Sequence, residues 1–133
     1  MNPSDSEIAE ILRGAKTIAV VGLSPKPERP SHGVSAYMQA QGYRIIPVNP
    51  GHDTILGEKA YKSLLDVPGP IDIVNIFREP AAVPEIVDQA IQKKAKAIWM
   101  QEGIVHNAAA EKARAAGLKI VMNKCIYKEH ARL

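Results

Sequence analysis

A short stretch rich in hydroxyl and basic side chains follows a buried apolar run near the start of the chain. The run TIAVV reads as a strand that is covered on both faces. The polar stretch after it offers a glycine for a sharp turn, two hydroxyls and two cations, at Gly22, Ser24, Lys26, Arg29 and Ser31. It leads into a predicted helix, whose free N–H groups and dipole favour an anion. We therefore predict a phosphate-binding loop; the alternative is a solvated surface loop with a capping serine.

This loop differs from the glycine pattern of dinucleotide-binding domains, G-x-G-x-x-G. Ser24 and Pro27 stand where the second and third glycines belong. The next predicted strand ends in Val48-Asn49-Pro50, whereas an NAD domain carries Asp or Glu there for the ribose hydroxyls. Both differences argue against NAD and FAD. Asn49 and Pro50 are candidates for contacting a ribose or an adenine, and simple turn chemistry is the alternative.

Two further strand ends carry polar side chains. Arg78 follows Phe77, and it is suited either to a phosphate contact or to an ion pair with an acidic neighbour such as Glu79. The segment Gln101-Glu102-Gly103 follows the run AIWM and can line the same crevice. Glu102 is the one side chain there that is suited to act as a base, although it also fits a purely structural role.

Apolar patterning alternates between strand-like runs and helix-like faces along the chain. The predicted strands are Thr17–Val21, Tyr43–Val48, Ile71–Phe77, Ala97–Met100 and Leu118–Met122. The predicted helices are Ser4–Arg13, Ser31–Gln41, a helix within Pro80–Lys94, Asn107–Ala116 and a short one at Ile126–Ala131, with one helical turn at Ser63–Asp66. Ser31 and Asn107 are the expected caps of their helices. Pro47 is expected at the end of its strand, or with its missing N–H on an unpaired side.

Short apolar strands that alternate with helices indicate parallel strands joined by right-handed crossovers. We predict a Rossmann-like three-layer α/β/α fold with a five-stranded parallel sheet in the order 3-2-1-4-5. The chain order changes direction between the first and fourth strands, and ligands bind outside the carboxyl ends of the strands at such a point. Residues 1–133 are expected to form one domain.

Composition excludes several other classes of function. The net charge is +3, but basic and acidic residues are interspersed and aromatic residues make up only 5%, which argues against a nucleic-acid partner. No apolar run is long enough for a membrane span. One cysteine excludes an internal disulfide and favours the reducing cytoplasm. No metal-ligand spacing is present, and no partnered acid–base group gives the four histidines, His32, His52, His106 and His130, a catalytic role.

Trp99 and Cys125 are expected to have structural roles. Trp99 lies in a predicted buried strand and should pack in or beside the core. Cys125 is interpreted as a buried thiol. Because it follows the fifth predicted strand at the ligand edge, pairing with a ligand thiol is the alternative for this residue.

Several strings together resemble a known family. IAVVGLSPKPERPS, GYRIIPVNP, ILGEKAYKSLLDVP, IDIVNIFR, AIWMQEG and GLKIVMNKC look like the stand-alone CoA-binding domain proteins. These in turn resemble the nucleotide-binding domain of the succinyl-CoA synthetase α subunit. The resemblance implies coenzyme A with its phosphates at the Gly22–Ser31 loop, Leu23 included, and its adenine near Asn49-Pro50, with Ile55 and the region after Phe77 completing that side. The string MQEG resembles the synthetase's TEG, with Gln101 in place of threonine.

The resemblance also limits the function. The synthetase carries its phosphorylated histidine in a second domain that this sequence lacks, so no catalytic residue is carried over. We expect a module that binds CoA or acyl-CoA as a carrier, sensor or partner subunit. The alternatives are a small acyl-CoA-processing enzyme that uses Glu102, and a nucleotide-responsive interaction protein. A protein partner or a homo-oligomer is compatible with all three.

Overall fold

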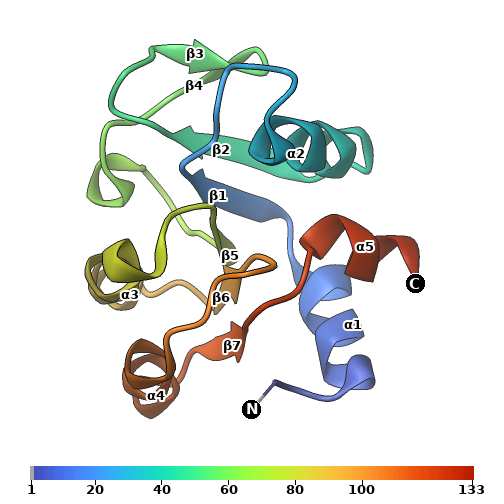
Figure 1. Ribbon diagram of the computed structural model, residues 1–133, viewed down its shortest axis with the longest axis vertical. Coiled ribbons are helices and arrows are strands. Elements are labelled where there is room, and N and C mark those ends of the chain that lie inside the picture. The colour runs from blue at the N-terminus through green and yellow to red at the C-terminus, as the bar shows by residue number, and fades with distance from the viewer. Residues whose placement is uncertain (1) are drawn as a thin grey trace.

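A sheet of five parallel strands forms the centre of the protein (Figure 1). The computed structural model describes residues 2–133. From one edge to the other the strands are β2 (Arg44–Val48), β1 (Thr17–Val21), β5 (Ile73–Ile76), β6 (Ala97–Met100) and β7 (Lys119–Val121). A two-stranded antiparallel hairpin, β3 (Thr54–Ile55) and β4 (Glu58–Lys59), lies beyond β2. The predicted Rossmann-like α/β class and its parallel sheet are confirmed.

The strand order matches the 3-2-1-4-5 pattern, but the third place is filled by a different segment from the one we expected. Outside β2, Tyr61 forms a single parallel bridge with Val48. If Tyr61 is counted as the third strand, the order begins 3-2-1-4-5 as expected, and β7 adds a sixth strand at the other edge. The predicted strand at Ile71–Phe77 does not lie there: its core is β5, which pairs with β1 on one side and β6 on the other. The point at which the order changes direction is therefore between β1 and β5.

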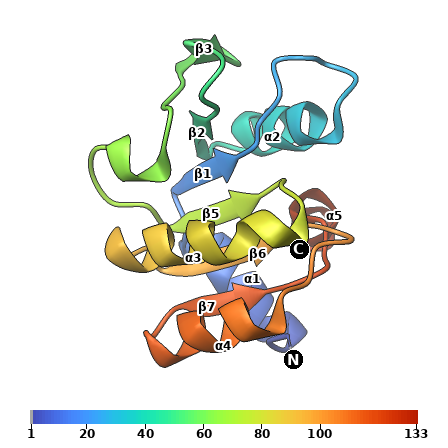
Figure 2. The ribbon, with the colours of Figure 1, turned by 60° about the vertical axis from the view of Figure 1, so that its left-hand side comes forward.

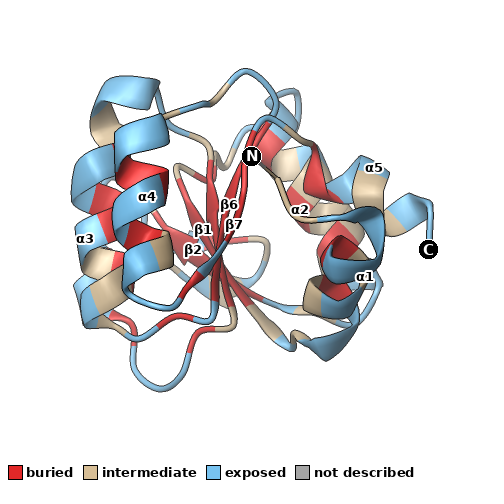
Figure 3. Ribbon diagram, turned by 90° about the horizontal axis from the view of Figure 1, so that it is seen from below, coloured by how far each residue is buried: buried red, intermediate tan, exposed pale blue. Residues whose placement is uncertain are grey.

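Helices cover both faces of the sheet, which gives three layers (Figures 2 and 3). One face carries α1 (Asp5–Gly14), α2 (Pro30–Ala40) and α5 (Ile126–Ala131), and the other carries α3 (Val83–Gln92) and α4 (Asn107–Ala115). Two 3₁₀ turns, η1 (Leu64–Asp66) and η2 (Pro80–Ala82), complete the fold. Each face has its own buried cluster. Trp99 is fully buried in the cluster beneath α1, α2 and α5, as predicted. Within residues 2–133, no helix has the length and apolar character to cross a membrane.

Helix starts show where local prediction succeeded and where it failed. Ser4 forms the predicted capping box with Glu7. The expected cap Ser31 is wrong: α2 begins at Pro30 with Arg29 before it, because proline needs no N–H partner at a first helical position. The expected cap Asn107 is also wrong, because it is the first helical residue of α4. His106 caps that helix instead, and its Nδ1 accepts a hydrogen bond from the Ala109 N–H at 3.1 Å.

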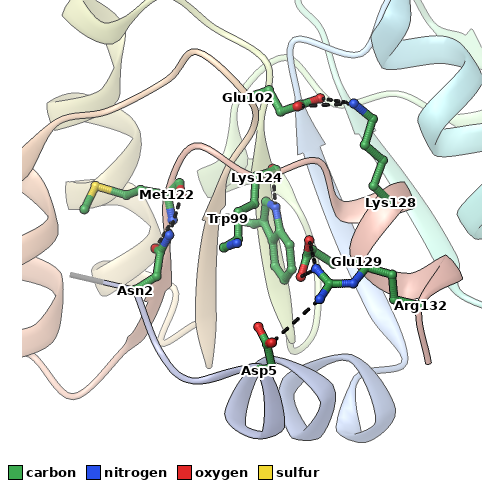
Figure 4. Close-up of polar contacts among 9 residues, drawn as sticks. All are labelled: Asn2, Asp5, Trp99, Glu102, Met122, Lys124, Lys128, Glu129 and Arg132. Atoms are coloured by element: carbon green, nitrogen blue, oxygen red, sulfur yellow. Dashed lines mark hydrogen bonds and ion pairs between the residues drawn. The ribbon is translucent and has the colours of Figure 1, made fainter.

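The two outer strands of the sheet are each partly covered. In β2, the Pro47 carbonyl accepts a hydrogen bond from the Tyr61 N–H at 3.0 Å, so the backbone polar side of Pro47 faces away from β1. The N–H that proline lacks is therefore not needed for pairing with β1, as expected. At the other edge, the Asn2 side chain donates to the Met122 carbonyl at 2.8 Å and accepts from the Met122 N–H at 2.7 Å (Figure 4).

The amino ends of the strands are joined by Asp72. One of its carboxylate oxygens accepts hydrogen bonds from the backbone N–H groups of Lys16 at 2.7 Å and Thr17 at 3.1 Å. Its other oxygen forms an ion pair with Lys96 at 3.3 Å. Partial burial alone would raise the pKa of Asp72, but these hydrogen bonds and the Lys96 charge outweigh it and lower the pKa below its ordinary value.

Candidate functional site

Three adjoining cavities lie along the carboxyl ends of the strands. We name each by one lining residue: the Lys62 cavity of about 460 Å³, the Lys26 cavity of about 400 Å³ and the Cys125 cavity of about 470 Å³. Gly22 and Asn49 line both of the first two, and Phe77 lines both of the last two. Shared walls make them one continuous depression, which we call the carboxyl-edge groove. It lies where the strand order changes direction, as the fold predicts.

Gly22 is the point of closest backbone approach in the groove. Its φ is +92°, and a Cβ atom there would lie 2.4 Å from the Phe77 carbonyl oxygen. No other residue type fits this position without moving the end of β5. Gly22 also lines the junction of the Lys62 and Lys26 cavities, so its backbone borders the groove.

The predicted phosphate loop is held by its own polar groups. The Ser31 hydroxyl oxygen accepts a hydrogen bond from the Ser24 N–H at 2.9 Å, and the Ser24 hydroxyl accepts from the Lys26 N–H at 3.1 Å. Each hydroxyl still has its own hydrogen to donate. Ser24 and Ser31 both line the Lys26 cavity, so they shape the loop and also face the groove.

Asn49 braces the first two strand ends against each other. Its Nδ2 donates to the Leu23 carbonyl at 2.9 Å, and its Oδ1 accepts from the Gly51 N–H at 2.8 Å. This is the turn role that the sequence left open beside a ribose contact. One Nδ2 hydrogen remains available, and both Asn49 and Pro50 line the Lys62 cavity.

Three cations on the groove have no ion-pair partner among the described residues. Lys26 and Arg29 lie in the loop before α2 and line the Lys26 cavity. Lys62 lines the opposite end of the groove. All three side chains are exposed, and the first turn of α2, which points at the Lys26 cavity, holds no acidic residue. The groove therefore carries cations without an ion-pair partner at two separate places along its length, and the acidic side chain of Glu85 also lines the Lys62 cavity.

Arg78 already has a partner. Its guanidinium forms an ion pair with Glu79 at 2.9 Å, and both side chains are exposed. The hydrogen bond from Arg78 holds the pKa of the Glu79 carboxyl below its ordinary value. The structure thus shows the ion pair that the sequence offered as one of two roles, while Arg78 still lines the Lys62 and Cys125 cavities.

The segment after β6 is tied to the carboxyl-terminal part of the chain. Glu102 forms an ion pair with Lys128 at 3.0 Å (Figure 4), and the hydrogen bond to Glu102 raises the pKa of Lys128. Gln101 is 5% exposed, and its Oε1 accepts from the Ile126 N–H at 3.0 Å. The Gly103 N–H donates to the Asn123 side chain at 2.7 Å. Both carboxylate oxygens of Glu102 contact the Lys128 ammonium group, at 3.0 and 3.2 Å, so this side chain already has a partner within the fold.

The predicted site included residues that the fold places elsewhere and lacked several that it brings in, of which Lys62 is the charged one most suited to a phosphate. The side chains of Leu23 and Ile55 are buried in the core beneath α2, and neither residue lines the three cavities. Gly103 does not line them either. Lys62 was missed. The available signal was the outer-strand position of Tyr61, which brings the residue after it to the groove.

The remaining candidates for chemistry are dispersed. His52 lines the Lys26 cavity, whereas His106 caps α4 and His130 bonds the Tyr37 hydroxyl at 2.9 Å. Cys125 is a buried free thiol that lines the Cys125 cavity. In the part of the chain that the structure describes, no three His, Cys, Asp or Glu side chains are grouped closely enough to hold a metal ion.

The parallel sheet and the groove at its carboxyl edge place the chain among the Rossmann-like α/β domains. The chain belongs to the CoA binding domain family, whose model matches residues 16–131. It is 47% identical over 130 residues to an uncharacterised protein, YneT, of Bacillus subtilis, a match that covers 98% of this chain and 96% of that one.

Solved structures and larger enzymes show the same likeness. A hypothetical protein from Pyrococcus horikoshii is 46% identical, with a TM-score of 0.95 over 98% of this chain and 92% of that one. The α subunit of an ADP-forming acetate–CoA ligase from Pyrococcus furiosus is 30% identical over 128 residues, which cover 84% of this chain. The match covers only 28% of that subunit. The predicted resemblance to CoA-binding domains of this kind is confirmed.

Proposed function

We propose that this protein binds coenzyme A, or an acyl-CoA, in the carboxyl-edge groove and acts as a carrier, sensor or partner module without catalysis of its own. One observation carries the proposal. The backbone of Gly22 borders the Lys26 cavity, and Lys26 and Arg29, which have no ion-pair partner among the described residues, line the same cavity before α2. Glycine backbone, a helix N-terminus and free cations together suit a pyrophosphate.

The parts of CoA can be assigned along the groove. In this proposal the pyrophosphate lies in the Lys26 cavity, and the adenosine lies toward Asn49, Pro50 and the Lys62 cavity. The pantetheine arm then extends past Phe77 into the Cys125 cavity, since Phe77 lines both that cavity and the Lys26 cavity. The groove residues proposed to contact CoA are Gly22, Ser24, Lys26, Arg29, Ser31, Asn49, Pro50, Phe77, Arg78, Gln101 and Glu102, with Leu23, Ile55 and Gly103 supporting them from behind.

The proposal of a non-catalytic module is based on the state of the polar groups. Catalysis needs a nucleophile or an acid–base pair within hydrogen-bond reach. Ser24 and Ser31 accept hydrogen bonds from backbone N–H groups of the loop, and within residues 2–133 neither hydroxyl is hydrogen-bonded to a histidine or a carboxylate. Glu102 is paired with Lys128. We further propose that residues 1–133 work as one binding domain in the cytoplasm, where the free thiol of Cys125 is stable.

Calorimetry with CoA, 3′-dephospho-CoA and NAD tests the ligand class. We expect CoA to bind at least about tenfold more tightly than NAD, since about 1.4 kcal/mol of extra charge-assisted bonding is enough for that factor. NAD binding more tightly than CoA would overturn the proposal. To test the absence of catalysis, the purified protein is incubated with acyl-CoAs and the release of free CoA thiol is measured. Turnover that disappears in Glu102→Gln, with CoA binding intact, would favour the enzyme instead.

A ligand-responsive interaction protein is the other function to be separated. If CoA binding sets the affinity for a partner protein or a second copy, the assembly state must change with ligand. Sedimentation of the purified chain with and without saturating CoA measures this for self-association. A shift in mass on adding CoA would favour the interaction role over a simple carrier.

A further inference from the structure

The Cys125 cavity is lined by one side chain whose hydrogen-bond donor the fold does not use. Gln101 lines this cavity and is 5% exposed. Its Oε1 accepts from the Ile126 N–H, which fixes the orientation of the side-chain amide because only the oxygen can accept from an N–H. The amide nitrogen Nε2 is then the free end, and it has no hydrogen-bond partner among residues 2–133.

An unused donor in such a place calls for an acceptor. A donor that borders a cavity and has no partner in the protein can bond an acceptor on a ligand that enters the cavity. Apolar groups make up much of the remaining wall, with Pro30, Val34, Phe77, Ile104 and the small thiol of Cys125. The charged residues on the wall, Arg78, Glu79 and Glu102, are already engaged in ion pairs. A group that fits here needs an apolar body and one neutral acceptor oxygen.

The position along the groove narrows the class of ligand. The Cys125 cavity shares Pro30 and Phe77 with the Lys26 cavity, where the proposed function places the pyrophosphate. The end of CoA that lies beyond its phosphates carries the thiol. Free CoA ends in an S–H group, which is a weak donor and a weak acceptor. An acyl-CoA ends in a thioester, which supplies both a carbonyl oxygen and an apolar acyl group.

We infer that the Cys125 cavity is an acyl-thioester subsite, in which Gln101 Nε2 donates a hydrogen bond to the thioester carbonyl oxygen, so that the protein selects acyl-CoA over free CoA. This inference rests on the proposed function. Gln101 is thus a specificity-determining residue. Its Oε1 holds the start of α5, and its Nε2 bonds the carbonyl that distinguishes acyl-CoA from free CoA.

The test compares three ligands on the full chain by calorimetry at pH 8. Acetyl-CoA has the carbonyl, S-ethyl-CoA has the same size without it, and free CoA has neither carbonyl nor acyl carbons. We expect the wild-type protein to bind acetyl-CoA about three- to tenfold more tightly than S-ethyl-CoA, which is the effect of one net hydrogen bond. Equal affinities for these two ligands would overturn the inference and leave CoA binding untouched.

Gln101→Glu supplies the protein side of the test. An ionised glutamate keeps an oxygen for the Ile126 N–H but has no hydrogen to donate to the carbonyl. We expect the preference for acetyl-CoA over S-ethyl-CoA to disappear in this variant, whatever the common effect of the new charge on all three ligands. A preference that survives would overturn the inference.

A matched control separates the charge from the position. Gln41→Glu makes the same change at the exposed end of α2, remote from the groove, and should keep the wild-type preference. Because the wild-type comparison of two ligands needs no variant, the inference stays testable if Gln101→Glu is unstable. Failure of all three ligands to bind the wild-type protein would instead overturn the proposed function.

Discussion

Asp72 at the amino ends of the parallel sheet and the two loop cations at its carboxyl ends differ in whether the fold uses their charge. At the amino ends, Asp72 binds the backbone of Lys16 and Thr17 and pairs with Lys96, so its charge is used within the fold. At the carboxyl ends, Lys26 and Arg29 have no partner among the described residues. The first arrangement stabilises the protein whether or not a ligand is present, while the second leaves charge available to an anionic ligand.

This difference predicts how mutations divide. Changes at the amino ends should alter the free energy of unfolding and leave ligand affinity unchanged, because the groove is at the other end of every strand. Changes to the free cations should do the reverse. Gly22 belongs to both groups, because its backbone borders the groove and also touches the end of β5.

Gly22→Ala should have the largest effect. Its Cβ would meet the Phe77 carbonyl oxygen, and its φ of +92° is unfavourable for alanine. We expect a loss of about 2–4 kcal/mol in the free energy of unfolding, which combines backbone strain with overpacking, and no measurable CoA binding. Urea unfolding and calorimetry measure the two effects. Gly14→Ala is the control, since a Cβ atom at Gly14 would meet nothing within 4 Å and the φ there is ordinary.

Asp72→Ala should destabilise the protein without touching the groove. Its hydrogen bonds connect charged and backbone groups, so we expect a loss of about 1.5–3 kcal/mol in unfolding free energy and wild-type CoA affinity. Asp88→Ala removes the exposed pair with Lys112 and should cost less. A change in CoA affinity for Asp72→Ala would contradict the division between the two ends.

The effect of Asp72 should also depend on pH. Its folded pKa is lowered, so its contribution to stability is fully present above the unfolded pKa of about 3.9 and is lost as the pH falls through the folded pKa. The difference in unfolding free energy between the wild-type protein and Asp72→Ala should therefore be constant from pH 7 to 5 and shrink below about pH 4. A constant difference down to pH 3 would argue against the lowered pKa.

Lys26→Ala/Arg29→Ala should weaken CoA binding by about ten- to thirtyfold at low salt, or about 1.4–2 kcal/mol. Salt should shrink this factor, because screening acts on exposed charges. Removal of two neighbouring cations should leave the unfolding free energy nearly unchanged. The control variant, Arg44→Ala/Lys119→Ala, removes the same charge at the amino ends of β2 and β7. Its CoA affinity should stay within about twofold of wild type, because salt screens charges that lie far from the ligand. An equal loss in both double variants would mean that net charge alone attracts the ligand.

The smallest effect concerns His106, a polar side chain that the fold uses as the cap of α4. His106→Ala should destabilise the protein by about 1 kcal/mol, because it removes the cap of α4. Asn107→Ala should be neutral or slightly stabilising, since Asn107 is a helical position that favours alanine. Melting temperatures of the two variants give the comparison. The reverse ranking would show that Asn107, as the sequence suggested, is the functional cap.

The sequence was sufficient to predict the class of fold because each buried strand is a short apolar run between turn residues. It was not sufficient to place the strand that contains Ile73–Ile76, since the choice of neighbour depends on pairings between segments that are far apart in the chain. The connection from Asn49 to Pro70 holds only a hairpin and one 3₁₀ turn, so no full strand occupies the outer position, and Tyr61 fills it with a single bridge.

The candidate site was predicted in part for the same reason. Residues that follow a strand directly reach the groove whatever the side-chain details, and Gly22 and Asn49 are of this kind. Partners from distant segments are not visible in the sequence. Lys128, which pairs with Glu102, is 26 residues away, and the free Nε2 of Gln101 depends on the Ile126 N–H. The role of Ser31 differs from the predicted cap because α2 already begins at Pro30. The Ser31 hydroxyl instead accepts a hydrogen bond from the Ser24 N–H.

Pro47 and Asn2 have a consequence for the behaviour of the protein at high concentration. An open sheet has two outer strands, and exposed N–H and C=O groups there can pair with another chain and start aggregation. In β2, Pro47 has no N–H to offer and Tyr61 occupies its carbonyl. Beside β7, the Asn2 amide occupies both backbone groups of Met122, as a neighbouring peptide would. A strand from another chain that pairs with either edge of the sheet would first have to displace one of these groups.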